Sequence, residues 1–113
     1  PEDPAIVAFR FMVLARASAS QALEDNDYDQ AIARVEEGLE RLRHFYRSHG
    51  RPEMEEHSAE ILSLEHWLDK IRADRPLTSR ELLQKALEEA VQKEDYERAA
   101  EMRDALRNLT AEG

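Results

Sequence analysis

Four histidines and many carboxylates are the residues of this sequence that could do chemistry, and metal binding is the chemistry they would suit. His44 and His49 come shortly before Glu53 and Glu56. A metal site on a helix needs its ligands on one face, usually at positions i and i+4, together with a third ligand. His44 and His49 are five positions apart, and no His-Glu-x-x-His pattern occurs. We therefore expect no metal site, and we interpret these histidines as surface residues near a helix C-terminus.

Other enzyme chemistry finds no support either. No two carboxylates stand out as a pair, and the sequence has no Gly-rich phosphate loop, Walker pattern or nucleophile elbow. It has no cysteine, which excludes thiol nucleophiles and disulfides and fits a reducing cytosol. Trp67 lies at helical spacing beside Leu64, Leu68 and Ile71, which favours a core position. We predict a protein that is not an enzyme and that uses no cofactor.

Composition limits the partners. The 113 residues carry a formal net charge of −9, with charged residues at 36% and no basic stripe. Such a chain is repelled by a phosphate backbone, so direct nucleic-acid binding is not expected. The longest apolar run, Ala5–Ala17, contains Arg10 and Arg16 and is too short to span a bilayer. We expect no membrane association and a cytoplasmic location.

The apolar residues recur at intervals of three and four, which is typical of amphipathic helices. Asp3, Asp27 and Thr78 are predicted N-caps, the last in a capping box with Glu81, and Gly50 is a predicted left-handed terminator. No segment alternates with period two for long enough to form a strand. The pattern predicts five helices: Pro4 to about Glu24, Tyr28 to about Ser48, Pro52 to near Ala73, Ser79 to about Lys93, and Tyr96 to about Leu109.

The fold class is therefore all-α, with a hairpin of two long helices, a third helix packed on it in a tetratricopeptide-like way, and a second hairpin. The linker around Pro76 divides the chain into residues 1–75 and 76–113. Residues 27–31, DYDQA, are echoed by residues 95–99, DYERA. In both, we expect the aromatic residue to pack back onto the preceding helix and the alanine to let the two backbones approach. The first hairpin also resembles a single tetratricopeptide repeat, although one repeat is too few for a solenoid.

Residues 95–106, DYERAAEMRDAL, carry a more specific resemblance. They resemble the second helix of the UVR motif, the helical hairpin shared by excinuclease subunits B and C. The preceding helix also fits, so the resemblance covers about residues 77–110. It implies a hairpin that catalyses nothing and binds another copy of itself. The pattern of an aromatic, an acid, two alanines, an Arg-Asp pair and an aliphatic is filled by Tyr96, Glu97, Ala99, Ala100, Arg103, Asp104 and Leu106.

The same resemblance implies the site residues. Arg103 is expected at the interface, where its planar guanidinium can bind a carboxylate of Glu89 or of a partner. The interface is predicted to include Tyr96, Ala99, Ala100, Arg103, Asp104 and Leu106. The seam between the two helices is predicted to include Leu83, Leu87, Tyr96, Ala99, Ala100 and Leu106.

The first helix offers a second candidate surface, because it is apolar nearly all the way round from Ala5 to Leu14. Such a helix must be buried on every face. Either it lies centrally between the two hairpins, or its far side, represented by Phe11 and Met12, contacts a partner. A homodimer through this side or through the last hairpin is expected.

The sequence thus predicts a protein-interaction module, accessory or regulatory, linked to DNA repair or to a stress response. The helicase and nuclease domains of the complete repair proteins are absent from this sequence. The alternative is a tetratricopeptide-like scaffold or peptide receptor, with a groove formed by the first three helices and no link to DNA repair. Direct nucleic-acid binding is the least favoured function.

Overall fold

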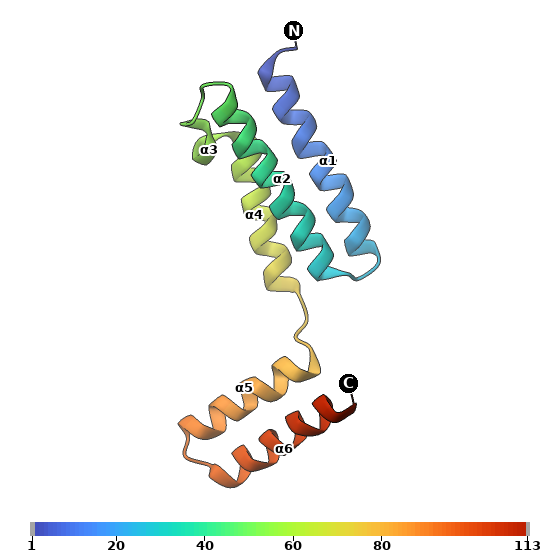
Figure 1. The fold of residues 1–113 in the computed structure, drawn as a ribbon, viewed down its shortest axis with the longest axis vertical. Coiled ribbons are helices and arrows are strands. Elements are labelled where there is room, and N and C mark those ends of the chain that lie inside the picture. Colours follow the sequence, from blue (N-terminus) through green and yellow to red (C-terminus); the bar gives the residue numbers. More distant parts are fainter. Residues whose placement is uncertain (1, 113) are drawn as a thin grey trace. The chain divides into compact units, whose positions relative to one another are not determined.

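The computed structural model describes residues 2–112, with side chains up to Leu109. These residues form six helices and no strand, which confirms the all-α class (Figure 1). The chain divides into two compact units, Pro1–Arg75 and Pro76–Gly113, which we call the N-terminal unit and the C-terminal hairpin. The helices are α1 (Pro4–Glu24), α2 (Tyr28–Ser48), α3 (Met54–His57), α4 (Ala59–Asp74), α5 (Ser79–Gln92) and α6 (Tyr96–Glu112).

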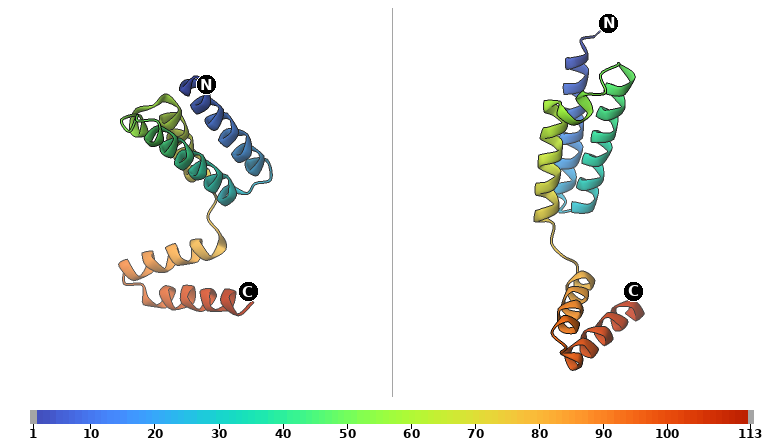
Figure 2. Two further views of the ribbon diagram at one scale, coloured as in Figure 1. Left: turned by 45° about the horizontal axis from the view of Figure 1, so that its top comes forward. Right: turned by 90° about the vertical axis from the view of Figure 1, so that its left-hand side faces the viewer.

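The N-terminal unit is a three-helix bundle of α1, α2 and α4, which lie side by side in Figure 1 and in the right-hand view of Figure 2. Its core is built from large side chains of α2 and α4, and Val35, Leu42, Ile61 and Leu64 are fully buried. Burying each such side chain stabilises the fold by about 1.5–3 kcal/mol. From α1 the core takes mainly small residues: Ala8, Ala15, Ala19 and Ala22.

A glycine sets the distance between α1 and α2. A Cβ atom added at Gly38 would lie 2.5 Å from the Cβ of Ala15, closer than two side chains can pack. The absence of a side chain at Gly38 therefore lets the two backbones approach where both helices also meet α4, since Leu64 lies near the same point.

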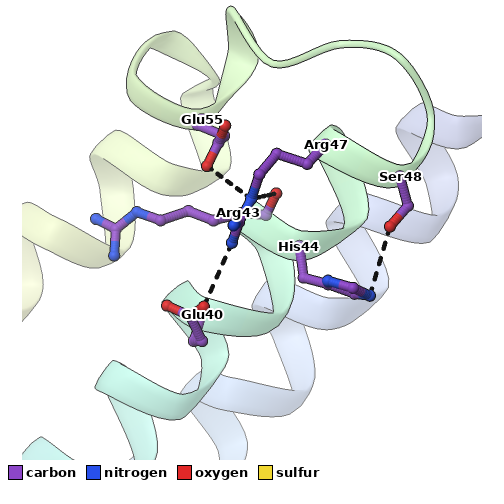
Figure 3. Close-up of polar contacts among 6 residues, drawn as sticks. All are labelled: Glu40, Arg43, His44, Arg47, Ser48 and Glu55. Atoms are coloured by element: carbon purple, nitrogen blue, oxygen red, sulfur yellow. Dashed lines mark hydrogen bonds and ion pairs between the residues drawn. The ribbon is translucent and has the colours of Figure 1, made fainter.

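The prediction of one helix from Pro52 to near Ala73 was wrong, because the chain breaks at Ser58. Ser58 has an extended backbone, and its buried hydroxyl accepts a hydrogen bond of 3.0 Å from the backbone N–H of Ile61. It is thus the N-cap of α4. The short α3 before it is joined to α2 by Arg47, whose Nε lies 3.0 Å from Glu55 (Figure 3).

The turns of the α1–α2 hairpin and of the C-terminal hairpin have the same geometry. Asn26 and Glu94 both adopt a left-handed backbone conformation, with φ of 57° and 60°. The next residue in each turn, Asp27 or Asp95, donates its N–H to a carbonyl of the preceding helix at 2.9 and 2.8 Å.

The same two aspartates cap the helices that follow. Asp27 accepts a hydrogen bond from the N–H of Gln30 at 3.0 Å, and Asp95 accepts one from the N–H of Arg98 at 3.2 Å. Every residue of the first turn thus has a structural counterpart 68 positions later in the chain.

The C-terminal hairpin has a much smaller core. Only Ala90 and Ala99 are buried among its described side chains, and Leu83, Leu87 and Leu106 are half-buried at the seam. The predicted capping box of Thr78 and Glu81 is confirmed, with both of its hydrogen bonds at 3.1 Å. Helix α6 continues to Glu112, past the predicted end near Leu109.

Within the N-terminal unit, helix α1 is not enclosed on every face. Its alanine side packs on the bundle, and its large apolar residues Ile6, Phe9, Val13 and Leu14 are exposed. At 21 residues and with a mean hydropathy of 1.3 over 18 of them, α1 is long and apolar enough to cross a membrane, contrary to the expectation from the shorter run Ala5–Ala17. The buried core helix of a soluble protein and a signal sequence near an N-terminus satisfy the same criterion, and 22% of this window is buried, so length and composition alone do not make α1 a membrane span.

Candidate protein-interaction site

The predicted interface residues of the C-terminal hairpin lie at three different places. Ala99 is only 8% exposed, inside the seam between α5 and α6. Ala100 is half-buried, and Arg103 and Asp104 are exposed one turn further along α6. Leu106 is half-buried at the seam.

The expectation that Tyr96 packs back onto the preceding helix, α5, is wrong. Its side chain is 65% exposed. The counterpart in the first hairpin, Tyr28, is partly buried against the core of the N-terminal unit. That core includes α4 residues, whereas the C-terminal hairpin contains only two helices. The ring of Tyr96 therefore has no third helix of its own unit to cover it.

Arg103 pairs with its sequence neighbour and not with Glu89 of the facing helix. Its Nε lies 3.5 Å from the carboxylate of Asp104, and both side chains are more than half exposed. Such a pair contributes under about 1 kcal/mol in water. The guanidinium and the carboxylate can therefore be drawn into contacts with a partner at little cost.

Comparison with the first hairpin shows which residues of the C-terminal hairpin share a face. In the N-terminal unit, a groove between α1 and α2 is lined by Leu14, Ala15, Ser18, Arg34, Glu37, Gly38 and Arg41, together with Phe11. The positions 68 residues later give a set with no charged member, which we call the apolar face: Leu82, Leu83, Ala86, Met102, Ala105, Leu106 and Leu109.

The apolar face is open among the described residues of its own unit. Leu82 is 54% exposed, and the other six side chains are half-buried. Of these seven, the sequence prediction of the interface contained only Leu106. The signal was present in the three-and-four spacing of both helices, but such spacing also describes a seam that the hairpin buries by itself.

The opposite face of the C-terminal hairpin combines charged and apolar side chains. In the first hairpin the corresponding side is covered by α4, as Asp29 and Glu36 show by pairing with Arg75 and Arg72 at 2.7 and 3.4 Å. We call its counterpart the charged face: Val91, Tyr96, Ala100, Arg103, Asp104 and Arg107.

Phe11 and Met12 do not represent the far side of α1. The ring of Phe11 lies 5.9 Å from that of Phe45 in an edge-on arrangement, and both Phe11 and Met12 pack against the core. The outward apolar side is formed by Ile6, Phe9, Val13 and Leu14 instead. Periodicity could not separate the two sets, because apolar residues stand all round this part of the helix.

The histidines do not gather into a metal site. His49 stacks on Phe45 with ring centroids 4.3 Å apart, and His44 contacts Ser48 on its own helix (Figure 3). Within the part of the chain that the structure describes, no group of three or more His, Asp or Glu side chains could hold a metal ion.

Comparison with known proteins bears on the C-terminal hairpin alone. No curated protein and no solved structure matches the chain significantly. The family model of the UvrB/uvrC motif matches residues 79–112, which are α5, the turn and α6. This match confirms the resemblance that was read from residues 95–106. The C-terminal hairpin of this chain is thus a UvrB/uvrC motif, of a kind that mediates interactions between proteins.

Proposed function

We propose that this chain is a non-enzymatic interaction module whose C-terminal hairpin binds a second hairpin of the same kind. The second hairpin belongs to another copy of the chain or to another protein with a UvrB/uvrC motif. The observation that carries the proposal is the open apolar face. A unit of fewer than about 40 residues usually needs oligomerisation or another staple to be stable. Covering the apolar face with a second hairpin would complete a four-helix bundle.

The charges beside the apolar face support pairing between two copies. Lys85 and Glu89 are exposed on α5, and Arg98 and Glu101 are exposed on α6. Consider a two-fold dimer in which α5 of one copy packs against α6 of the other and both turns lie at the same end. The charged residues beside the apolar face on α5 would then meet those on α6 of the other copy. Glu89 would then face Arg98, and Lys85 would face Glu101. Exposed pairs of this kind fix orientation more than they add affinity.

We further propose that the chain is an accessory or regulatory protein of the cytosol, linked to DNA repair or to a stress response through its partners. It would act by bringing proteins together. Residues 76–113 contain nine acidic and six basic residues, so the hairpin itself is acidic. We expect no measurable binding to duplex DNA at physiological salt. Micromolar binding to a bubble-containing duplex that weakens steeply with added salt would contradict this part of the proposal.

Sedimentation equilibrium tests the self-association. At tens of micromolar, the parent should sediment with about twice its mass of 13.1 kDa. Leu82→Glu should shift the chain to monomer, because it places a charge in the apolar face. Leu62→Glu is the matched control, since Leu62 is a similarly exposed leucine of α4 in the other unit. A parent that sediments as a monomer would overturn self-association and leave a hairpin of another protein as the partner.

The outward side of α1 is the competing contact. Phe9→Glu and Val13→Glu place charges there without entering the core, because both side chains are exposed. A dimer that dissociates with these two changes and survives Leu82→Glu would move the interface to the N-terminal unit.

A further inference from the structure

The charged face of the C-terminal hairpin corresponds, position by position, to the side of the first hairpin that α4 covers. The equivalence rests on the two turns, which share their left-handed residue, their aspartate cap and their hydrogen bonds. It extends into the helices, because Ala22 and Ala31 are buried beside the first turn as Ala90 and Ala99 are beside the second. The N-terminal unit therefore shows how a third helix packs on a hairpin of this kind.

Helix α4 holds the first hairpin through an apolar stripe with basic residues at its edge. The stripe consists of Ile61, Leu64, Leu68 and Ile71. At the edge, Arg72 pairs with Glu36 at 3.4 Å, and Arg75, just after α4, pairs with Asp29 at 2.7 Å. Leu68 lines one groove with Leu39 of α2, which gives the register of the two antiparallel helices.

At the positions that α4 contacts in the first hairpin, the C-terminal hairpin keeps the residue types at the edge and changes those at the centre. The acids Asp29 and Glu36 correspond to Glu97 and Asp104, both exposed. The aromatic and aliphatic positions Tyr28 and Leu23 are also kept, as Tyr96 and Val91. The two central positions differ in charge, because the buried Val35 and Leu39 are replaced by the exposed arginines Arg103 and Arg107.

We infer that the charged face binds one amphipathic helix of a partner protein, antiparallel to α6, in the place that α4 takes on the first hairpin. That helix carries acidic residues opposite Arg103 and Arg107, and basic residues one step further along, opposite Asp104 and Glu97. An apolar residue covers Tyr96 and Val91, which expose large surfaces in the free hairpin. This site lies on the opposite face from the proposed hairpin–hairpin contact, so both could be occupied at once.

The chain supplies its own probe for this site. A labelled peptide of residues 58–75 with Leu68→Glu and Ile71→Glu keeps Arg72 and Arg75 and places carboxylates where Arg107 and Arg103 would meet them. It cannot replace α4 in the N-terminal unit, because Leu68 and Ile71 are buried there. Fluorescence anisotropy with the full-length chain should show saturable, salt-sensitive binding with a dissociation constant on the order of 100 µM, as for a short helix that must order on binding.

Charge reversal then tests the register. Arg103→Glu with Arg107→Glu should weaken binding of this peptide about ten-fold, and should favour a second peptide with Lys at positions 68 and 71 by a similar factor. Leu82→Glu is the control, because it alters the apolar face and should leave peptide binding unchanged at a protein concentration at which circular dichroism shows its helix content to equal that of the parent. Sedimentation of the same variants separates this inference from the proposed function, since the two arginine changes should preserve the dimer.

Two results would overturn the inference. One is no saturable binding of either peptide to the full-length chain at millimolar concentration. The other is binding that the arginine reversal leaves unchanged, or that Leu82→Glu abolishes while its hairpin stays folded, because the peptide would then occupy the apolar face or another surface. Circular dichroism should confirm that each variant keeps the helix content of the parent.

Discussion

The first and last hairpins of this chain share a turn and differ in almost everything that surrounds it. Both turns use a left-handed residue, Asn26 or Glu94, and an aspartate that caps the next helix. Away from the turn, the first hairpin is charged on its open side and apolar on the side that α4 covers. The last hairpin has no third helix among the described residues of its unit, and it is apolar on the first of these sides and carries exposed arginines on the second. A few residues near the turn thus define a hairpin, and the residues on its faces define what covers it.

Exchanging the residues at one equivalent pair of positions should have the largest effect. Val35→Arg places a charge in a fully buried site of the N-terminal unit and should cost about 4 kcal/mol or more. The reverse exchange, Arg103→Val, alters an exposed position and should change stability by less than about 0.5 kcal/mol. Urea unfolding followed by circular dichroism measures both. Similar losses in the two variants would contradict the difference in burial between the two equivalent positions.

Close approach of the helices should be specific to the first hairpin. Gly38→Ala introduces a Cβ atom 2.5 Å from that of Ala15, so α1 and α2 must move apart. The overpacking should cost about 1–3 kcal/mol, reduced by up to about 1 kcal/mol because alanine favours a helix. The last hairpin carries Leu106 at this position without a clash. A Gly38→Ala variant that melts at a higher temperature than the parent would contradict the close approach.

The paired alanines of the last hairpin should respond unequally. Ala99→Leu overpacks the seam and should cost about 1–3 kcal/mol. Ala100→Leu should be tolerated within about 0.5 kcal/mol, because Ala100 is half-buried and the first hairpin carries Ile32 at the same position. Thermal melts followed by far-UV circular dichroism compare the two. If both variants melt like the parent, the seam has been assigned to the wrong residues.

The caps give the smallest effect and the most direct test of the shared turn. Asp27→Ala and Asp95→Ala each remove a side-chain acceptor from a helix N-terminus, and each should cost about 1 kcal/mol. Native-state hydrogen exchange, read at α2 and at α6, measures the loss in each unit separately. A loss confined to one of the two helices would show that the turns resemble each other in shape but not in energetics.

Local signals made most of the fold predictable. The ends of α1 and α2, the Thr78 capping box and the left-handed Gly50 followed from residue types whose preferences act within one helical turn. The break at Ser58 was missed, because a serine inside an apolar pattern is compatible with a continuous helix and becomes a cap only when its hydroxyl is buried against α4. The exposure of Tyr96 was missed for a related reason, since it depends on a third helix that the first hairpin has and the second lacks.

The site was less predictable than the fold. The UvrB/uvrC motif could be read from residues 95–106, but the faces could not, because Leu106 of the apolar face and Arg103 of the charged face are only three residues apart in the sequence. For α1, the positions of large and small apolar residues say more about which side faces the core than their hydrophobicity does. Phe11 and Met12 face inward with the alanines, and Ile6 and Phe9 face outward.

The small core of the last hairpin has a consequence for how the chain behaves at different concentrations. Only Ala90 and Ala99 are buried among its described side chains, so we expect the isolated hairpin to have a small free energy of local unfolding. Any partner that binds only the folded hairpin stabilises it by mass action. Backbone amides of α5 and α6 should therefore exchange with deuterium more slowly as the protein is concentrated, whereas those of α2 and α4 should exchange at rates that dilution leaves unchanged. Folding of this hairpin would then report how much partner is present.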